Sequence, residues 1–376
     1  MTPARSVNIM LHPDFRKEEE SNFPETDAWF GVKWRKCATF DYKFTKVDKE
    51  LLHYPGENPY LTDDLALVTI ESEKSEIPVV LVSDEKSRLH FMPDFEFKLP
   101  KSFIKVLYRC DDFLHQENAN RQALLSLVPT FMMLNLSSEL YDATTASLSY
   151  AIDIKNNGFT IDAKGISATA PKLLKRLVRA LSESESWPET NFEMAKNEVK
   201  TSFQDKILNA GNVGNDIRTK WLEQGSVTLP QQLKAMDSNE CNFENMKKCV
   251  KEMLENSSLD MLYQGNARAE DAKDLFTEVL KLNPVGGNRL GKDGEKTGIN
   301  VRKLVRNETM HVNSFNTRTS DNHYATKYYQ WRPSSAREAV LIELFCDIIS
   351  ESTFNELRTK RQLGYSAFKF STDWFF

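Results

Sequence analysis

The residues with the clearest chemical potential lie in the stretch FNELRTKRQLGY, residues 354–365. Arg358 carries a guanidinium and Tyr365 a phenol, and both groups donate hydrogen bonds to carbonyl or carboxylate oxygens. If they bracket a helix-to-strand corner, both can point into one groove and hold a peptide or stabilise an oxyanion. The competing interpretation is structural, because Arg358, Lys360 and Arg361 fall in the last helical turn, where cations interact favourably with the helix dipole. On these residues alone, the structural interpretation is favoured.

The histidine pattern contains no zinc-peptidase motif. H-E-x-x-H and its inverse H-x-x-E-H both place two imidazoles on one helical face. No two of the six histidines of this chain lie within five residues of each other. His115 with Glu117 is the nearest cluster of candidate ligands, and its spacing is more typical of a solvated helix start. No metal site is predicted in this chain. The histidines are His12, His53, His90, His115, His311 and His323.

A glycine-rich stretch comes close to a nucleotide-binding motif. The run GGNRLGK, residues 286–292, has the G-x-x-x-x-G-K spacing of a phosphate-binding loop. Asp293 follows it, where such a loop needs Ser or Thr to bind magnesium. The run also follows a helix rather than a strand, so its backbone amides are not aimed by a strand–loop–helix turn. An interdomain linker is therefore favoured over nucleotide binding.

Composition is that of an ordinary globular chain. The 376 residues are 40% hydrophobic and 27% charged, with a formal net charge of −5, and this length favours two or three domains. A slightly acidic chain without a basic block gives no reason to expect nucleic acid as a partner. Apolar runs such as ALLSLVPTFMMLNL fall short of a bilayer span, and the first residues are a poor secretory signal, so no membrane association is predicted.

The cysteines predict a reducing compartment. They are five in number and dispersed, which argues against a disulfide framework in a chain long enough to bury a real core. Cys241 and Cys249 lack C-x-x-C spacing, and Cys346 falls on the apolar side of its helix, where a buried thiol is inert. We expect a cytoplasmic protein, with an organelle matrix as the second choice.

Hydrophobic periodicity predicts one complete mixed unit after an extended start. Pro55, Gly56 and Pro59 interrupt regular structure in residues 46–75, and an apolar strand, LALVTI, follows. Trp29, Phe30 and Trp34 in the stretch DAWFGVKW are expected to anchor an extended segment onto a neighbouring domain rather than to bind a ligand. From about residue 77 we expect strands at IPVVLVSD, RLHFM and FEFKLPKSFIKVLYRC, then a helix at 117–141 in which Pro129 causes a kink or a break between two helices. After it we expect a hairpin at 148–163, helices at 170–184, 189–209, 213–223 and 243–256, a strand at LDMLYQGN and a helix at 269–282.

A second unit repeats the start of the first. After the linker come strands at VRKLVR and HYATKYYQ, then an apolar helix whose Ser335 and Glu338 have capping-box spacing. In both units a strand and an apolar helix lead to a similar strand start, LSY at 148–150 and LGY at 363–365. The repeat predicts α+β domains, each with an antiparallel-rich sheet packed with helices. One copy is expected to be full and the second truncated.

The 354–365 stretch closely resembles a segment of the pitrilysin family of zinc metallopeptidases, in its insulysin- and nardilysin-like branch. The resemblance continues in order through nearly the whole chain, and the LRTK–QLGY core is its most specific part. The other segments that carry it are DAWFG, NPYLTDDLAL, LHFMPDFEFKLPK, YDATTASLSYAIDI, YQGN and IELFCDIISEST.

The resemblance implies a fold and a domain division. Members of the family have four homologous domains of the pitrilysin type, also described as LuxS/metallohydrolase-like, in two bowl-shaped halves that enclose a peptide-sized chamber. The implied division is 1–45 as the tail of a preceding peptidase-family domain, 46–75 as the inter-half linker, 76–285 as the third domain, 286–299 as a glycine-rich linker and 300–376 as the truncated start of the fourth domain.

The resemblance also implies roles for Arg358 and Tyr365. In the family, these two side chains reach across the chamber, bind the substrate backbone and stabilise the tetrahedral intermediate. Both are therefore expected to bind substrate here, and no catalytic residue is assigned. Arg361 departs from the family, whose members usually carry an acidic residue at that position. The zinc of the family is expected in an N-terminal half that this sequence does not contain.

Two functions remain open at this point. The first is a non-catalytic, substrate-binding segment of an insulysin-like zinc metalloendopeptidase, inactive alone, whose partners are peptide substrate and a zinc-bearing N-terminal half or a related full-length subunit. The alternative is a stand-alone inactive pseudo-peptidase that binds peptides or serves as a hetero-oligomerising scaffold. A homo-oligomer is a further option, and a nucleotide-regulated protein is the weakest.

Overall fold

The computed structural model describes residues 22–36, 56–69, 75–114, 117–155, 158–287, 301–305, 324–330 and 335–364. The chain divides into two compact units, Met1–Glu57 and Asn58–Phe376, and each is treated by itself. The expected strand VNIML, the glycine-rich run from residue 288 onwards, Tyr365 and every histidine except His90 lie outside the described residues.

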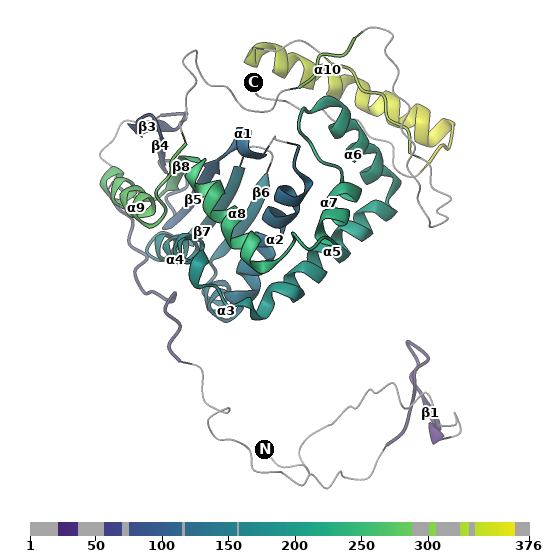
Figure 1. The fold of residues 1–376 in the computed structure, drawn as a ribbon, viewed down its shortest axis with the longest axis horizontal. Helices are drawn as coiled ribbons and strands as arrows, with labels where there is room; N and C mark the ends of the chain where they lie inside the picture. Colours follow the sequence, from purple (N-terminus) through teal and green to yellow (C-terminus); the bar gives the residue numbers. More distant parts are fainter. Residues whose placement is uncertain are drawn as a thin grey trace. The chain divides into compact units, whose positions relative to one another are not determined.

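A short hairpin occupies the described part of the first unit (Figure 1). Strand β1, Glu25–Thr26, pairs antiparallel with β2, Lys33–Trp34. The carboxylate of Asp27 accepts hydrogen bonds from the backbone N–H groups of Trp29 and Phe30, and Gly31 closes the turn with a φ of 67°. Trp29 and Phe30 are consequently displayed at the tip, 89% and 87% exposed. Their docking onto another domain stays a prediction.

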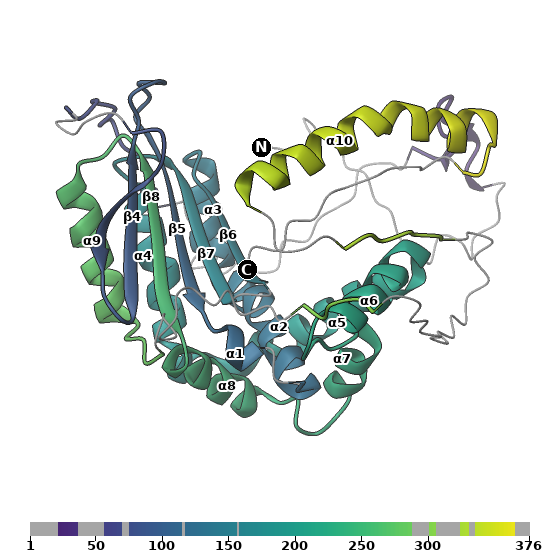
Figure 2. The same cartoon turned by 90° about the horizontal axis from the view of Figure 1, so that it is seen from above.

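A six-stranded sheet forms the centre of the second unit. Its strand order is β3-β4-β8-β5-β7-β6, and Figure 2 shows β4, β8, β5, β7 and β6 side by side in that order. Only β4 and β8 run parallel; the other neighbouring strands pair antiparallel, so the predicted antiparallel-rich sheet is confirmed. The strands are β3, Val79–Ser83; β4, Ser87–Pro93; β5, Lys101–Arg109; β6, Ser149–Lys155; β7, Gly158–Ile166; and β8, Ser258–Gly265.

The predicted hairpin at 148–163 is present as β6 and β7, which pair from Ser149 with Lys164 to Lys155 with Gly158. Gly158 has a φ of 149°, and a Cβ there would lie 2.1 Å from the carbonyl oxygen of Tyr108 on β5. Any side chain at this position would therefore push β7 away from β5. The glycine is needed both for the turn and for the close approach of the next strand.

Helices cover one face of this sheet. Helices α4, Ala170–Ser182, and α9, Ala269–Leu282, pack against each other; α4 packs on β5 and β7, and α9 on β3 and β4. Helix α2, Ala119–Asn135, packs on β6 and also contacts α5, α7 and α8. The core lies between these helices and the alternate strand residues Leu89, Phe91, Ile104, Val106, Tyr108, Phe159, Ile161, Leu259, Met261 and Tyr263.

The remaining described helices follow the predicted positions closely, with two additions. The short helix α1 and helix α7 were not predicted from the sequence, although Thr228 caps α7 through a capping box with Gln231. The bounds are α1, Asp111–Leu114; α3, Ser137–Thr145; α5, Phe192–Leu208; α6, Ala210–Leu222; α7, Leu229–Met236; α8, Phe243–Glu255; and α10, Ala336–Phe354.

The expected bend at Pro129 lies elsewhere. Helix α2 continues through Pro129, which is buried, and ends at Asn135; the chain then turns by 69° into α3. Packing on both sides of the proline holds the helix together despite the missing N–H. Among the described helices, none alone is long and apolar enough to cross a membrane, although the bent pair α2 and α3 together meets the length and composition.

Extended segments depart most from the sequence expectations. Residues 65–69 of the expected strand LALVTI form no strand, and the described residues of the two expected strands after the linker form only one isolated bridge, between Val301 and Glu223. The segment at 56–69 contains no helix or strand and turns at residues 59–60. The side chain of Asn58 donates hydrogen bonds to the carbonyl of Asp142 and the hydroxyl of Thr145, at 2.7 and 3.0 Å, which fastens this segment to the middle of the chain.

Candidate functional site

Helix α10 positions the residues that the sequence singled out. Ser335 accepts a hydrogen bond from the N–H of Glu338, and the Glu338 carboxylate accepts one from the N–H of Ser335 at 3.0 Å. This capping box confirms the predicted helix start. After Phe354 the helix widens into a π-helical turn, Asn355–Lys360, which carries Arg358. Wide turns of this kind occur frequently at functional sites.

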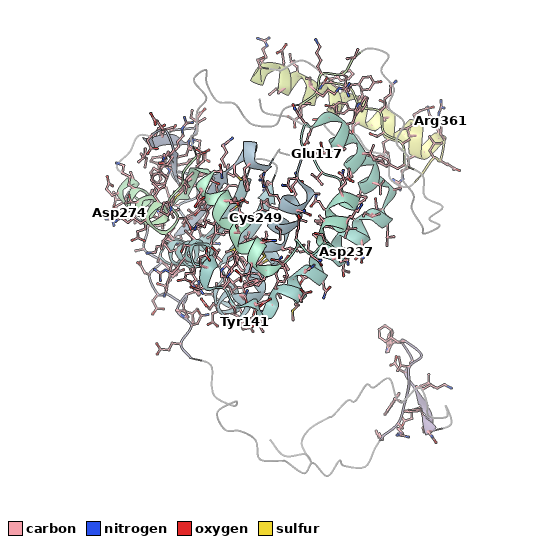
Figure 3. The ribbon with its side chains drawn as sticks, in the orientation of Figure 1. Glu117, Tyr141, Asp237, Cys249, Asp274 and Arg361 are labelled. Carbon is pink, nitrogen blue, oxygen red and sulfur yellow. The ribbon has the colours of Figure 1, made fainter. Side chains whose placement is uncertain are left out.

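Arg358 differs from its two cationic neighbours. Its guanidinium carbon lies 4.9 Å from the centre of the Phe354 ring, a cation–π distance that orients the side chain along the helix. Arg361 and Lys360 instead share the carboxylate of Glu356, at 2.8 and 3.3 Å; Figure 3 labels Arg361 at this end of the chain. The charge of Arg361, the position that departs from the family pattern, is therefore locally compensated by Glu356.

The chain leaves this helix through a residue with left-handed backbone conformation. The N–H of Leu363 donates to the carbonyl of Leu357 at 3.0 Å, and Gln362 takes the left-handed conformation with a φ of 50°. Gln362 rather than Gly364 therefore turns the chain away from the helix. Because Tyr365 lies outside the described residues, its proximity to Arg358 stays a prediction.

A second group of charged residues lies on the sheet face opposite α4 and α9. Lys105 on β5 pairs with Asp162 on β7 at 3.1 Å, and Arg109 on β5 pairs with Asp260 on β8 at 3.1 Å. The two carboxylates are 19% and 17% exposed, so both pairs lie at the boundary between protein and solvent. Partly buried pairs of this kind are screened less by salt than fully exposed pairs.

This charged face can contact a polar chain. The Oδ1 atom of Asp162 is buried and has no hydrogen-bond partner among the described residues. Phe103, Leu107 and Leu262 are partly buried on the same face, since they alternate with the core residues of β5 and β8. The surface thus combines apolar side chains with paired charges.

Sequence reasoning missed these pairs. A signal was present, because charged residues alternate with apolar ones in KSFIKVLYR and again at Asp162 and Asp260. Alternation predicts a polar face, but the partner of each charge depends on a strand register that local pattern does not provide.

Other candidate chemistry is not assembled in the described residues. No group of three or more His, Cys, Asp or Glu side chains there could hold a metal ion. The four described cysteines are free thiols, of which Cys110, Cys241 and Cys249 are buried. Burial raises the pKa of Cys249 to about 12 and also raises the pKa of Cys241. Neither thiol has the lowered pKa of a nucleophile.

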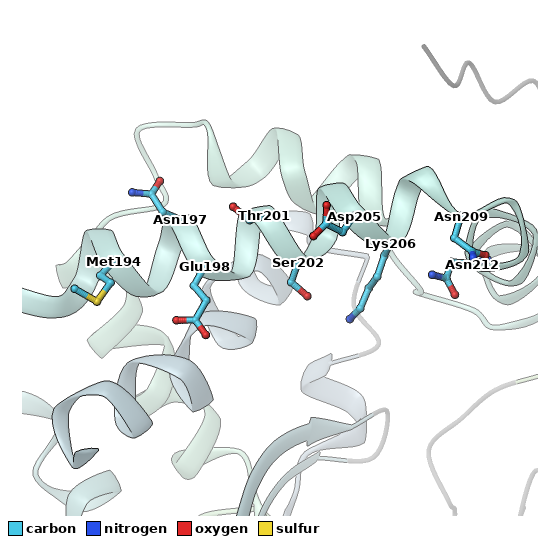
Figure 4. Close-up of a pocket in the computed structure, with 9 residues that line it drawn as sticks. All are labelled: Met194, Asn197, Glu198, Thr201, Ser202, Asp205, Lys206, Asn209 and Asn212. Carbon is cyan, nitrogen blue, oxygen red and sulfur yellow. The ribbon is translucent and has the colours of Figure 1, made fainter. Parts of the chain in front are cut away.

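A broad groove of about 1040 Å³ follows α5 (Figure 4). Its lining consists of short polar side chains with one thioether, and acids and a lysine are spread along successive turns rather than gathered at one point. We find no converging set of catalytic groups in it. The lining residues are Met194, Asn197, Glu198, Thr201, Ser202, Asp205, Lys206, Asn209 and Asn212.

Known proteins match the chain over most of its length. It is 26% identical to nardilysin of Rattus norvegicus over 350 residues, covering 91% of this chain and 29% of that protein. It is 25% identical to insulin-degrading enzyme of Homo sapiens over 368 residues, covering 94% of this chain and 34% of that protein. The chain therefore spans about a third of the length of these relatives.

A comparison with solved structures supports the same relationship at the level of the fold. The crystal structure of pitrilysin superposes with a TM-score of 0.63 at 21% identity, covering 86% of this chain and 33% of that one. Two family models also match: "Middle or third domain of peptidase_M16" over residues 1–235 and "Peptidase M16 inactive domain" over residues 240–375. This chain belongs to the peptidase M16 family and has its pitrilysin-type α+β fold.

Proposed function

We propose that this chain is a non-catalytic, substrate-binding part of an insulysin-like zinc metalloendopeptidase. The observation that carries the proposal is the match to both the middle and the inactive domains of the M16 family along one continuous chain. The position of Arg358 on a widened helical turn, over the ring of Phe354, supports a binding role for this residue. Its substrate would be a peptide, held by hydrogen bonds to backbone carbonyls.

The described residues do not fit zinc, since they contain no metal-binding group. We therefore derive no reaction step through a metal in this chain. In the proposal, zinc and the general base come from a separate N-terminal M16 segment, on the same polypeptide or on a partner. Arg358 and Tyr365 would contribute donors for the substrate carbonyl as it becomes an oxyanion.

A domain division and a compartment belong to the same proposal. We propose 1–45 as the end of a second domain, 46–75 as a linker, 76–285 as a third domain and 300–376 as part of a fourth. The free thiols of Cys110, Cys241 and Cys249 support a reducing compartment, and the cytoplasm is proposed.

Reconstitution tests the catalytic contribution. The chain would be mixed with a purified zinc-bearing N-terminal M16 half, and hydrolysis of an internally quenched peptide would be followed. We expect turnover only in the mixture. Tyr365→Phe and Arg358→Ala should each lower turnover about 100-fold, since each removes one donor to the oxyanion. Arg361→Ala removes the same charge from the residue that follows this turn and is the matched control, with turnover expected within about twofold.

The outcomes separate the two functions. Loss of turnover in Arg358→Ala with retention in Arg361→Ala supports the proposal. Equal turnover in all variants would remove Arg358 and Tyr365 from the mechanism. Binding of the N-terminal half without any turnover would favour the alternative, a pseudo-peptidase scaffold that binds peptides or relatives.

A further inference from the structure

Two extended segments are attached to the end of α6. The N–H of Arg302 donates to the carbonyl of Leu222 at 2.7 Å, and Val301 bridges to Glu223. The side chain of Gln330 joins the two segments, because it accepts from the N–H of Leu304 at 2.7 Å and donates to the carbonyl of Arg302 at 2.9 Å. Residues 301–305 and 324–330 thus hold each other, and residues 301–305 hydrogen-bond to the last residue of α6.

A notch on α6 receives the second segment. Gly211 and Gly214 leave room for the ring of Tyr324, and a Cβ on Gly214 would lie 2.2 Å from that ring. The Tyr324 hydroxyl donates to the side-chain oxygen of Asn215 at 3.1 Å. Both segments are therefore fixed to one helix, and we call the contact between them and residues 211–225 the α6 joint.

Glu223 lies inside this joint. It is only 4% exposed and lines a cavity of about 400 Å³ together with Val301 and Arg302. Lys220 and the indole of Trp221, both on α6, also line the cavity, and Lys220 pairs with Glu117. The Trp221 N–H is buried without a hydrogen-bond partner among the described residues. Burying an ionised carboxylate costs free energy, and the docked segment shields Glu223 from water.

Burial and a nearby cation act on the pKa of Glu223 in opposite directions. Desolvation raises the pKa of Glu223 to about 7, and the charge of Arg218 on α6 partly opposes this rise. The other charged groups that line the cavity are Lys220, Glu117 and Arg302. Lys220 is engaged by Glu117 and by the carbonyl of Ser226. The carboxyl group is therefore more easily neutral in the docked state than in water.

We propose that the α6 joint is a proton-sensitive latch, in which neutral Glu223 favours docking of residues 301–305 and ionised Glu223 releases them. When this segment leaves, the cavity opens and water can solvate the carboxylate. When the segment returns, that solvation is lost. The inference concerns a contact within this chain and does not depend on a peptidase role.

The direction with pH follows from linkage. An acid whose pKa is higher in the docked state contributes docking free energy below its solvated pKa of about 4.5 and loses it as pH rises towards 7 and above. Relative to a variant without the charge, docking should weaken about tenfold between pH 6 and pH 8. Alkaline solution therefore opens the latch.

Hydrogen exchange of residues 301–305 tests the latch directly. Protection of this segment would be compared between the full chain and its Glu223→Gln variant at pH 6, 7 and 8. Intrinsic exchange rates cancel in the ratio, because the exchanging segment has the same sequence. We expect the ratio of wild-type to variant protection to fall about tenfold from pH 6 to pH 8. Glu244→Gln, which alters an exposed carboxylate paired with Lys247 on α8, should give no pH-dependent ratio.

The experiment has clear negative outcomes. A constant ratio across this pH range would overturn the latch. Loss of protection in Glu223→Gln at every pH would overturn it too, since the docked segment would then need the carboxylate charge. A third variant, Gly214→Ala, displaces Tyr324 and reports whether the two segments dock together; it should lower protection at all three pH values equally.

Discussion

Helices α2 and α10 begin with the same kind of signal but differ in burial. Asn118 caps α2 and Ser335 caps α10, each through a side chain that accepts a backbone N–H. Yet Phe131 of α2 is fully buried, whereas Phe345 of α10 is 59% exposed. Helix formation at both places follows from local capping and propensity, while burial depends on what packs against the helix.

The helices that bury α2 come from parts of the chain far away in the sequence. Helices α5, α7 and α8, which contact it, begin 73 or more residues after its first residue, at Phe192, Leu229 and Phe243. The apolar helix expected after the linker is present as α10, but the described residues leave many of its apolar side chains exposed. The exposed large side chains of α10 are Val340, Leu341, Leu344, Phe345, Ile348 and Phe354. An apolar helix face therefore indicates that another element can pack on the helix, but it does not show that one does.

A matched pair of phenylalanine substitutions should show the largest difference. Phe131 packs against the rings of Trp187 and Phe243, with centroids 5.1 and 5.8 Å away. Phe131→Ala should lower the free energy of unfolding by about 3–5 kcal/mol, since it leaves a cavity in a packed core. Phe345→Ala should change it by less than about 0.5 kcal/mol. Urea unfolding followed by far-UV circular dichroism measures both, and equal losses would show that α10 is covered in solution.

Thiol reactivity gives a second contrast between the covered and the exposed helices. Burial raises the pKa of Cys249 on α8 to about 12, and Cys346 on α10 is partly exposed. Burial both disfavours the Cys249 thiolate and shields its sulfur from the reagent, so its alkylation at pH 8 should be slower than that of Cys346 by about a hundredfold or more. Iodoacetamide labelling with peptide mapping measures the two rates in a Cys37→Ser background. If the rates coincide, the core around α8 opens rapidly.

Local features were predictable where a short stretch contains its own partner. The β6–β7 hairpin and the Ser335–Glu338 capping box were expected and are present. The strand order was not predictable, because β4 and its parallel neighbour β8 are separated by 164 residues. The pair Arg109–Asp260 depends on the same long-range register, which a pattern of alternating residues cannot supply.

In the candidate site too, some features were predictable from a short stretch of sequence and others were not. Arg358 was identified from its own short stretch, and its local setting at the end of α10 is described. The compensation of Arg361 by Glu356 was missed even though the two residues are five apart. On a regular α-helix, residues five apart do not face each other, but the π-helical turn brings them together. The widened turn, which the sequence did not predict, thus explains why Arg361 reaches Glu356.

Removal of the caps should have the smallest effect and should distinguish the two helices most directly. Asn118→Ala should lower the global free energy of unfolding by about 1 kcal/mol, because α2 unfolds together with the core. Ser335→Ala removes an equivalent cap, but α10 has little buried surface to couple its helicity to that core. We therefore expect faster hydrogen exchange in the first turns of α10, with an unchanged midpoint of global unfolding. A lower global midpoint for Ser335→Ala would instead mean that α10 is a cooperative part of the folded unit, and its exposed stripe would then have to be covered in solution.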